Sequence, residues 1–321
     1  MTYQPFTPAT GLFNPHLQTM WASLIRRRPA LKTHRERVEL ADGDFLDLDW
    51  AITDNNKKTI VLMIHGLTGS IQSPYACGLL HHLSQMNYQP VVMHLRACSG
   101  EINRLARLYH SGETGDLDYV VQHIRRAHPH RPIAVIGFSL GGNMLLKWLG
   151  ESVTDRAIDA AVAVSVPFDL YHSARQLDRG FARLYQWNLL RSLRRTLRAK
   201  SHHPEIRHLL PDLNRMRNFY QFDDGVTAPL HGFTGAMDYY QQNSSRQFLK
   251  SIRIPTLILH AKDDPFLLQE DIPETNELSD TVQLELSPHG GHVGFVGGTI
   301  FSPQYWLEPR IAAFLQEKLP T

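Results

Sequence analysis

The sequence predicts an α/β fold built on a mostly parallel central sheet. Short β-branched apolar runs alternate with helical patterns through the first half of the 321-residue chain. Strands that alternate with helices need crossover connections, and these connections place successive strands parallel to one another. A second observation is a tight glycine-bounded turn at 137–141, which leads from an apolar run directly into a helical pattern. The chain also exceeds the usual size of a single domain, so an inserted subdomain is expected.

The first half of the chain supplies a hairpin and then alternating elements. Residues 37–40 and 45–50 are strand-like and flank a D-G turn signal, which predicts an antiparallel hairpin. In the part that follows, apolar runs predict buried strands and helical periodicity predicts helices. In order, these are a strand at 59–65, a helix at about 74–86, a strand at 90–95, a helix at 116–127, a strand at 132–136, a helix from 142 and a strand at 160–166.

Ser139 stands at the centre of a G-x-S-x-G pentapeptide, directly after the predicted strand at 132–136. A sharp strand-to-helix turn of this kind lifts the serine hydroxyl above the sheet of an α/β-hydrolase. Gly137 and Gly141 fit the same geometry, because a Cβ on either side of so tight a turn would clash with backbone. We therefore predict the α/β-hydrolase fold with Ser139 as nucleophile, rather than a surface turn that happens to contain serine.

A serine nucleophile needs a general base within hydrogen-bond reach and a third group that orients the base. In this fold the order along the chain is serine, acid, histidine. The strand predicted at 282–286 runs into a loop at 287–294 that contains His289 and His292. Glycines in the neighbourhood of His292 would let its ring approach the serine closely. His292 is therefore the expected base, and His289 is its competitor.

The acid is expected after the strand at 254–260, because open parallel sheets bind ligands outside the carboxyl ends of their strands. Asp263 and Asp264 both follow that strand end. We favour Asp264, which directly precedes Pro265, and we expect Asp263 to cap a helix or loop. Asp169 is a third candidate, because it follows the end of the preceding strand-like run.

The developing oxyanion needs backbone donors, which normally make a major electrostatic contribution to such reactions. The N–H of Leu140, immediately after the nucleophile, is the first expected donor. The second is the N–H of Leu67, in the loop at 65–70 that follows the strand at 59–65. His65 is expected to brace this loop rather than to take part in catalysis.

Between residues 168 and 249 the pattern changes, because Arg, Tyr and Gln become more frequent and no clear strand is present. We predict a helical cap inserted at 168–249 into an α/β-hydrolase core of residues 1–167 and 250–321. Caps of this kind shape the acyl pocket and exclude water. A helix predicted at 184–198 has leucines on one face and arginines largely elsewhere. This is typical of a surface for anionic lipid or, as we favour, of a cap helix that packs on the core with a solvated basic side.

Composition argues against several classes of function. The formal net charge of +2 gives no general attraction to nucleic acid, and neither the 18 histidines nor the two cysteines show a metal-ligand spacing. No metal and no other cofactor is therefore expected. Cys77 and Cys98 give no disulfide framework, and the sequence shows neither a secretory signal nor an apolar run long enough to span a bilayer. These features predict a soluble cytoplasmic protein.

Short motifs spread over nearly the whole chain carry a family likeness. They are N-P-H-L-Q-T at 14–19, H-G-L-T-G-S at 65–70, S-P-Y at 73–75, R-A-C-S-G at 96–100, Y-H-S-G-E-T at 109–114, G-F-S-L-G-G-N at 137–143, F-D-D at 222–224, H-A-K-D-D-P-F at 260–266 and H-G-G-H-V-G-F at 289–295. With these motifs the chain resembles the AB hydrolase-4 family and, within it, the bacterial YheT-like esterases. The resemblance implies a carboxylic ester hydrolase with Ser139, Asp264 and His292 as charge-relay residues. Some eukaryotic members of that family act on phospholipids or transfer medium-chain acyl groups to alcohols.

Two of these motifs, at 96–100 and 109–114, have no obvious step in ester cleavage. Residues 111–114 and Asp116 are expected to cap the start of the helix predicted at 116–127. The alternative is that Arg96 or Glu113 braces the loop around the active site.

The combined prediction is hydrolysis of carboxylic esters with short- to medium-chain acyl groups, through an acyl-enzyme intermediate on Ser139. The expected substrate is a small-molecule or lipid-like ester, and no nucleic-acid partner is expected. Two alternatives use the same scaffold: transfer of the acyl group to an alcohol, or a catalytically silent protein that binds a lipid or another ligand. Peripheral contact with a membrane through the basic cap helix is a further alternative, which we do not favour.

Overall fold

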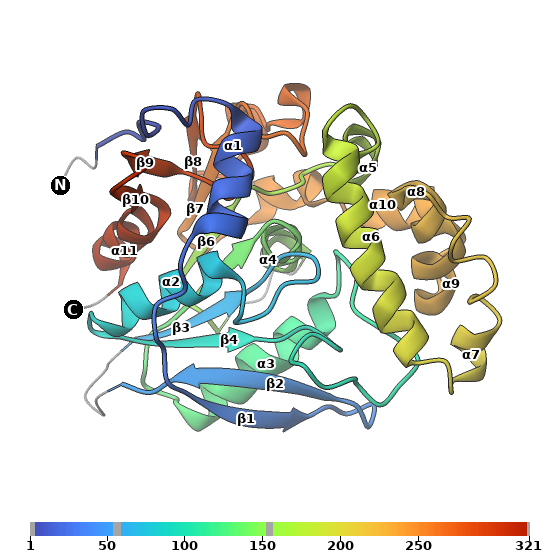
Figure 1. Cartoon of the computed structure of the whole chain (residues 1–321). Coiled ribbons are helices and arrows are strands. Elements are labelled where there is room, and N and C mark those ends of the chain that lie inside the picture. Colours follow the sequence, from blue (N-terminus) through green and yellow to red (C-terminus); the bar gives the residue numbers. More distant parts are fainter. Residues whose placement is uncertain (1–3, 54–58, 152–156, 320–321) are drawn as a thin grey trace.

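The computed structural model, which describes residues 4–53, 59–151 and 157–319, contains an eight-stranded sheet (Figure 1). Its strand order is β1-β2-β4-β3-β5-β6-β7-β8. The strand bounds are β1 Thr33–Glu39, β2 Phe45–Ala51, β3 Thr59–Ile64, β4 Tyr88–Met93, β5 Ile133–Phe138, β6 Ala160–Val164, β7 Thr256–Ala261 and β8 Val282–Ser287. β1 pairs antiparallel with β2, and β2 with β4, whereas the other neighbouring pairs are parallel. The predicted fold class, with its N-terminal antiparallel hairpin, is confirmed.

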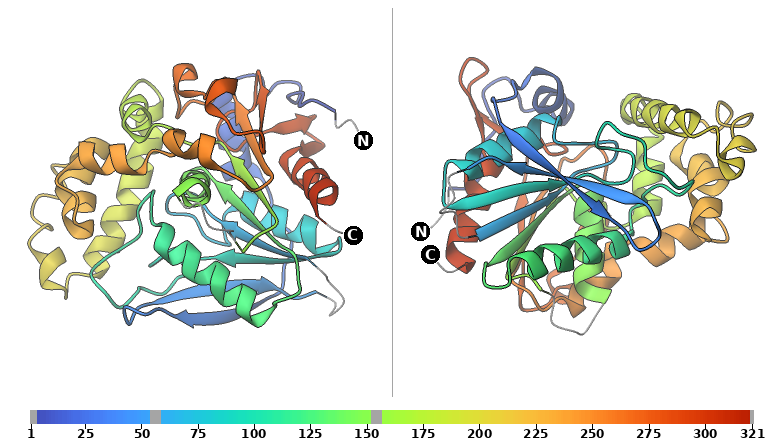
Figure 2. Two further views of the ribbon diagram at one scale, coloured as in Figure 1. Left: turned by 180° about the vertical axis from the view of Figure 1, so that it is seen from behind. Right: turned by 90° about the horizontal axis from the view of Figure 1, so that it is seen from below.

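Helices cover both faces of the sheet because its central strands are apolar on both sides. Alternate residues of β3 join two different buried clusters, with Ile60, Leu62 and Ile64 in one and Val61 and Met63 in the other. This alternation is the period of two of a β-strand. The first cluster packs against α3 (Thr114–Ala127) and α4 (Leu140–Glu151), and the second against α2 (Pro74–Ser84) and α11 (Leu307–Lys318) (Figure 2).

The chain between β6 and β7 is helical, and residues 168–249, all of which the structure describes, contain no strand. The helices are α5 Leu170–Leu177, α6 Ala182–Ala199, α7 Pro204–Arg207, α8 Phe219–Phe222, the π-helical turn η2 Asp223–Thr227, α9 Ala228–His231 and α10 Ala236–Asn243. They lie together at one end of the molecule (Figures 1 and 2) and contribute most of a third buried cluster. We refer to residues 168–249 as the cap region.

The leucine face of α6 packs inward, as the sequence predicts. Leu190 and Leu197 are buried, and Leu189 and Leu193 are half-buried. The division of the chain into core and cap domains at 168 and 249 stays a prediction. The ends of the predicted core ranges, residues 1–3 and 320–321, lie outside the described residues.

The N-terminal segment contains a short helix that sequence analysis did not identify. α1 (Pro15–Met20) begins at Asn14, whose side-chain oxygen accepts hydrogen bonds from two backbone N–H groups of the first turn, and it continues into the π-helical turn η1 (Trp21–Ile25). Gln18 is fully buried, and its amide binds the backbone N–H and C=O of Val296. The helix is therefore fastened to the segment that follows His292.

Several shorter elements complete the chain. They are η3 Ser245–Ser251, η4 Gln269–Asp271 and η5 Thr275–Glu277, which are 3-10 turns, and the two-stranded ribbon of β9 Val296–Gly298 and β10 Pro303–Tyr305. Within the described part of the chain, no helix has the length and apolar character needed to cross a membrane.

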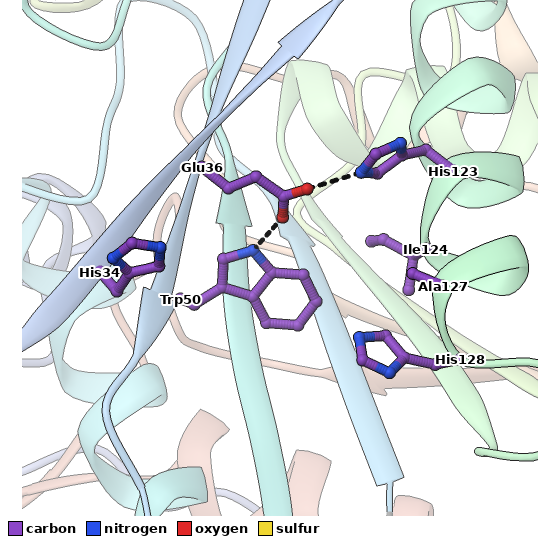
Figure 3. Close-up of a pocket in the computed structure, with 7 residues that line it drawn as sticks. All are labelled: His34, Glu36, Trp50, His123, Ile124, Ala127 and His128. Carbon is purple, nitrogen blue, oxygen red and sulfur yellow. Dashed lines mark hydrogen bonds and ion pairs between the residues drawn. The ribbon is translucent and has the colours of Figure 1, made fainter.

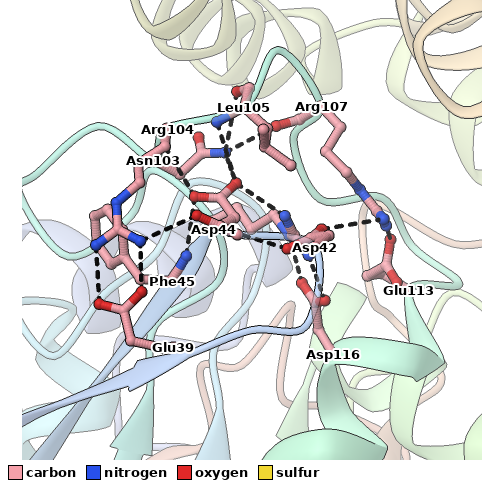
Figure 4. Close-up of polar contacts among 12 residues, drawn as sticks. Glu39, Asp42, Asp44, Phe45, Asn103, Arg104, Leu105, Arg107, Glu113 and Asp116 are labelled. Carbon is pink, nitrogen blue, oxygen red and sulfur yellow. Dashed lines mark hydrogen bonds and ion pairs between the residues drawn. The ribbon is translucent and has the colours of Figure 1, made fainter.

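A buried network of charges connects the hairpin turn with α3 (Figure 4) and continues to the end of α6. The Arg96 guanidinium, 2% exposed, donates to Asp44 at 2.8 Å and to both oxygens of Asp116 at 2.7 Å. Asp44 accepts a further hydrogen bond from the Asn103 side chain. Asn103 in turn accepts two hydrogen bonds from Lys200, at 2.6 and 2.9 Å. Lys200 is the C-cap of α6 and is fully buried, so this network ties the cap region to the core.

The interpretation of residues 111–114 and Asp116 as helix caps is wrong. α3 begins at Thr114, and its N-cap residue, Glu113, makes no side-chain capping hydrogen bond. The Asp116 carboxylate is instead occupied by Arg96, and the Thr114 hydroxyl donates to Glu151. Buried charge pairing has taken these side chains away from the helix terminus. Arg96 joins the hairpin turn to α3, and its hydrogen bonds and ion pairs within the described part of the chain do not include the loops around Ser139, so its expected role as a brace of the active-site loop stays a prediction.

Candidate active site

Ser139 lies in a strained turn between β5 and α4. Its φ angle is +51°, in the left-handed region that residues other than glycine rarely adopt. The close packing of this turn accounts for its glycines. A Cβ on Gly137 would lie 2.3 Å from the carbonyl oxygen of Gly141, and a Cβ on Gly141 would lie 2.6 Å from the carbonyl oxygen of Ile64. The turn projects the serine hydroxyl from the carboxyl end of the sheet.

The structure brings together the three residues expected to form the charge relay. His292 Nε2 lies 2.9 Å from Ser139 Oγ, and His292 Nδ1 lies 2.8 Å from Asp264 Oδ2. A carboxylate only accepts hydrogen bonds, so Nδ1 carries the ring proton and Nε2 is left free to accept the serine proton. The side chains of His292 and Asp264 are 9% and 1% exposed, which strengthens the electrostatic interaction between them.

The two adjacent aspartates have different contacts. Asp264 accepts from the His292 ring and from the backbone N–H of Phe266. Asp263 accepts from the backbone N–H of Gly291 at 2.9 Å and pairs with His289 at 3.2 Å. Asp263 thus bonds to the histidine loop at His289 and Gly291, whereas Asp264 bonds to the His292 ring itself.

Asp169, the third candidate acid, is occupied elsewhere. It is the N-cap of α5, where its side chain accepts from the backbone N–H of His172 at 2.8 Å. This is the usual role of an aspartate at the start of a helix.

Three contacts that support His292 were not identified from the sequence. The Thr19 hydroxyl accepts a hydrogen bond from the backbone N–H of His292 at 2.9 Å. The Phe266 ring stacks on the imidazole, with centroids 3.9 Å apart and an interplanar angle of 6°. The Ser165 hydroxyl accepts from the backbone N–H of Val293. Thr19 and Phe266 both lie within motifs noted above, but only the folded chain shows which atoms they contact.

The loop around Leu67 is held on both sides by tyrosine hydroxyls. Tyr75 accepts a hydrogen bond from the backbone N–H of Gly66, and Tyr109 accepts one from Thr68, each at 2.8 Å. Burial raises the pKa of Tyr75 to about 12 and that of Tyr109 well above 10, so both hydroxyls stay protonated. The N–H of Leu67 lies between these two fixed amides.

His65 braces the same loop, the role expected for it. Its Nε2 accepts from the backbone N–H of Leu95 at 3.1 Å, so its Nδ1 carries the proton and donates to the carbonyl oxygen of Gly66 at 2.7 Å. Complete burial lowers the pKa of His65 to about 3, which keeps the ring neutral.

Ser139 and His292 open onto a cavity of about 100 Å³. Leu67 and Leu140, the two residues expected to donate to an oxyanion, also line it, and Leu140 is the first residue of α4, where helix N–H groups are free. Most of the remaining wall is apolar and comes from the cap region. Its residues include Leu170, Ala174, Leu177, Leu189, Phe219, Tyr239 and Tyr240.

Asp223 is the carboxyl group that the cap region contributes to this cavity. Its two oxygens accept hydrogen bonds from the Thr227 hydroxyl at 2.6 Å and from the Tyr240 hydroxyl at 2.7 Å. Burial raises the pKa of Asp223 to about 6, so this wall of the cavity changes charge near neutral pH. Sequence analysis noted Asp223 only as part of a motif, because nothing in its spacing connects it with Ser139.

A second pocket, of about 260 Å³, lies between the N-terminal hairpin and α3 (Figure 3). Glu36 is its central acidic group, and it accepts from Trp50 Nε1 at 2.7 Å and pairs with His123 at 2.6 Å. The pocket contains neither Ser139 nor His292 among its lining residues. It is a separate cleft whose carboxylate is already paired with protein groups.

Two groups of side chains in the described part of the chain could each present three metal-ligand atoms within 4.8 Å of one another. They are His110, Glu113 and His231, and Asp169, His172 and Asp271. Glu113 forms an ion pair with Arg107, and His172 pairs with Asp271 at 2.5 Å. In both groups a carboxylate therefore already has a partner within the protein.

Comparisons with known proteins identify the family and support the fold. The protein family described as alpha/beta hydrolase fold matches residues 59–299. The YheT protein of Escherichia coli (strain K12) is 44% identical over 97% of this chain and 92% of its own length. The phospholipase ABHD3 of Mus musculus is 29% identical over 92% of this chain and 74% of its own. An esterase from Pyrococcus furiosus superposes with a TM-score of 0.60 at 17% identity, covering 99% of this chain and 100% of its own, and so supports the fold alone.

Proposed function

The chain belongs to the α/β hydrolase fold family and is a carboxylic ester hydrolase, and on that premise we propose that it cleaves short- to medium-chain acyl esters through an acyl-enzyme intermediate on Ser139. The match to YheT also confirms the resemblance to the AB hydrolase-4 family. The observation that carries the proposal is the line of hydrogen bonds from Ser139 through His292 to Asp264, at 2.9 and 2.8 Å.

In the first half of the reaction, Ser139 Oγ attacks the ester carbonyl carbon while His292 Nε2 takes the hydroxyl proton. The carbonyl oxygen becomes an oxyanion, and the backbone N–H groups of Leu67 and Leu140 donate to it. Asp264 stabilises the imidazolium that forms. When the tetrahedral intermediate collapses, His292 gives its proton to the departing alkoxide, and the acyl group remains on Ser139.

In the second half, a water molecule takes the place of the alcohol. His292 removes a proton from this water as its oxygen attacks the acyl carbon, and a second oxyanion forms at the same two donors. Collapse breaks the bond to Ser139 Oγ, which recovers its proton from His292. The carboxylic acid leaves, and the enzyme returns to its starting state.

The lining of the cavity supports an acyl chain of limited length. Its volume of about 100 Å³ is small, and its wall is mostly leucine and aromatic side chains from the cap region. An apolar pocket of this kind favours an alkyl chain over a charged group, because the chain leaves water on binding. The name of the mouse relative, a phospholipase, supports a lipid-like ester as the natural substrate.

A small fluorophosphonate tests the nucleophile directly. We expect intact mass spectrometry to show one phosphonyl adduct on the wild-type protein and none on Ser139→Ala. A series of p-nitrophenyl esters from acetate to dodecanoate then measures chain-length preference, with a maximum expected at short to medium chains. Turnover should fall by roughly 10⁴- to 10⁶-fold in Ser139→Ala. An unlabelled wild-type protein, or a Ser139→Ala protein with full turnover, would contradict the proposal.

The same assay separates hydrolysis from transfer to an alcohol. With water as the acceptor, added ethanol should leave the carboxylic acid as the main product of the p-nitrophenyl esters. If the ethyl ester becomes the main product at low ethanol concentration, the enzyme is an acyltransferase on the same catalytic residues.

A further inference from the structure

Five large apolar side chains are exposed where α1 approaches the start of α6. They are Phe13, Leu17, Phe181, Leu184 and Trp187, with exposed fractions between 43% and 58%. We call this set the apolar rim. Single exposed apolar residues are ordinary, but a group contributed by two segments far apart in the sequence needs a physical reason.

Contacts between the two segments show that the rim is one surface. The His16 ring of α1 lies 4.7 Å from the Phe181 ring, and His16 Nδ1 lies 3.3 Å from the Tyr185 hydroxyl of α6. Figure 1 shows both helices on the same side of the molecule. The approach of α1 therefore places its exposed side chains beside those at the start of α6.

The rim borders the catalytic groups. The Tyr185 ring lies 5.0 Å from the Phe266 ring, and Phe266 stacks directly on His292. Leu189, one helical turn beyond Tyr185, lines the cavity that contains Ser139. A molecule resting on the rim would thus lie close to the catalytic groups.

The outer face of α6 continues from the rim as a row of arginines. The 18-residue helix contains five arginines and no acidic residue. At 100° per residue, Arg191, Arg195 and Arg198 share the exposed face with Leu184 and Trp187, opposite the buried leucines. The exposed face is thus apolar in its first half and basic in its second half.

We propose that this face of α1 and α6 docks on an anionic lipid surface. Apolar side chains that include a tryptophan suit the boundary between headgroups and acyl chains, and arginines form paired hydrogen bonds with phosphate. A second copy of the chain is a poorer occupant, because α6 contains no acidic residue and a contact between two α6 faces would leave both arginine rows without a partner. The surface is argued from exposure and charge, and it rests on the proposed function only for its use in presenting lipid esters to Ser139.

The test measures co-sedimentation with vesicles of phosphatidylcholine, alone or mixed with phosphatidylglycerol. Ser139→Ala protein is used so that no lipid is consumed. We expect binding to the mixed vesicles, weaker binding to phosphatidylcholine alone, and release by salt. Arg191→Glu combined with Arg195→Glu should weaken binding by more than tenfold, since each basic side chain near such a surface contributes about fivefold.

Matched controls come from the same chain. Leu184→Ser combined with Trp187→Ser should abolish binding, whereas Phe301→Ser should not, although Phe301 is 94% exposed in the turn between β9 and β10. Arg126→Glu is the control for charge, because Arg126 is exposed on α3. The arginine variant, the rim variant, Phe301→Ser and Arg126→Glu are also made with Ser139 intact. With Ser139 present, each should hydrolyse the water-soluble p-nitrophenyl acetate at the wild-type rate, which separates a failure of docking from a failure of catalysis.

Three results would overturn the proposal. One is equal vesicle binding by the rim variant and by Phe301→Ser. A second is a wild-type dimer in solution that the rim substitutions convert to a monomer, because the rim would then be a contact between copies. The third is displacement of the protein from vesicles by a short oligonucleotide while the rim substitutions have no effect, since the arginines would then bind polyanions in general.

Discussion

The central strands of the core and the helix α6 of the cap region bury their apolar side chains to very different extents. Every residue of β3, β5, β6 and β7 is buried, and the two clusters that they form continue into helices on both faces. In the cap region, α6 leaves Leu184 and Trp187 about half exposed on its outer face. Packing alone can specify the core, whereas the sequence of α6 also has to suit whatever its outer face meets.

The core and the cap region also contribute different kinds of residue to the candidate active site. The three proposed charge-relay residues, Ser139, Asp264 and His292, follow the carboxyl ends of β5, β7 and β8. The cap region contributes cavity wall, including Leu189 and Asp223. Changes in the core should therefore remove activity or stability, and changes in the cap should alter which ester is bound.

The largest expected effect distinguishes the two aspartates after β7. Asp264→Asn should lower kcat by about 10⁴-fold, because an amide cannot hold the imidazole in the required tautomer. Asp263→Asn should lower it by about tenfold or less, since among the described residues the Asp263 carboxylate bonds to His289 and to the backbone of Gly291, not to His292. Steady-state kinetics on p-nitrophenyl butyrate would check this, and equal losses in the two variants would show that the acid is misassigned.

The next effect compares a core glycine with a cap glycine. Gly137→Ala should lower the free energy of unfolding by about 3 kcal/mol or more, because its Cβ would lie 2.3 Å from backbone atoms of Gly141. Gly225→Ala, in the cap region, meets only the flexible end of Met216 and should change it by about 1 kcal/mol or less. Urea unfolding measures both, and similar losses would mean that the cap packs as tightly as the core.

A smaller loss of kcat is expected when the hydrogen bond between Thr19 and the backbone of His292 is removed. Thr19→Val removes the acceptor of the His292 backbone N–H and should lower kcat by about tenfold with little change in KM. Ser23→Ala is the control, because its hydroxyl bonds only to backbone of the same helical segment. A rise in KM with unchanged kcat would indicate that Thr19 shapes the substrate pocket instead of positioning His292.

The smallest effect concerns charge in the cavity. The pKa of Asp223 is raised to about 6 by burial, so its carboxyl is neutral below that pH and ionised above it. The neighbouring Tyr239 and Tyr240 have pKa values raised further above 10 and stay neutral throughout. The KM for an apolar ester should therefore rise by a few fold between pH 5 and pH 7.5 in the wild type, by the charge-burial argument.

Asp223→Asn separates this effect from other effects of pH on the reaction. In that variant the KM for the apolar ester should be nearly constant over the same pH range, while the pH dependence of kcat stays as in the wild type. If KM rises equally in both proteins, Asp223 is remote from the bound acyl chain.

The features of the fold and of the candidate site that could be predicted from the sequence are those that depend on residues close together in the chain. The strands, the serine turn and the order of the proposed charge-relay residues follow from periodicity, glycine placement and strand ends. Tyr75 and Tyr109 were noted only as members of motifs, and their role was not predicted, because their hydroxyls bind the backbone of a loop that periodicity cannot place beside them. Asp116 was misread as a cap because its true partner, Arg96, is brought to it only by the fold.

The hydrogen bond from the His292 backbone to Thr19 spans 273 residues, and it adds the N-terminal segment to the parts of the chain that the active site needs. The recognised family region begins at residue 59 and ends at 299. A protein trimmed to those limits would keep every proposed reacting atom, yet it would lose α1 and α11, and with α1 the support of the base. A family match identifies the residues that relatives share. The residues that position the base for proton transfer can lie outside that match, as Thr19 does. For this chain, the support of the base extends back to Thr19 in α1.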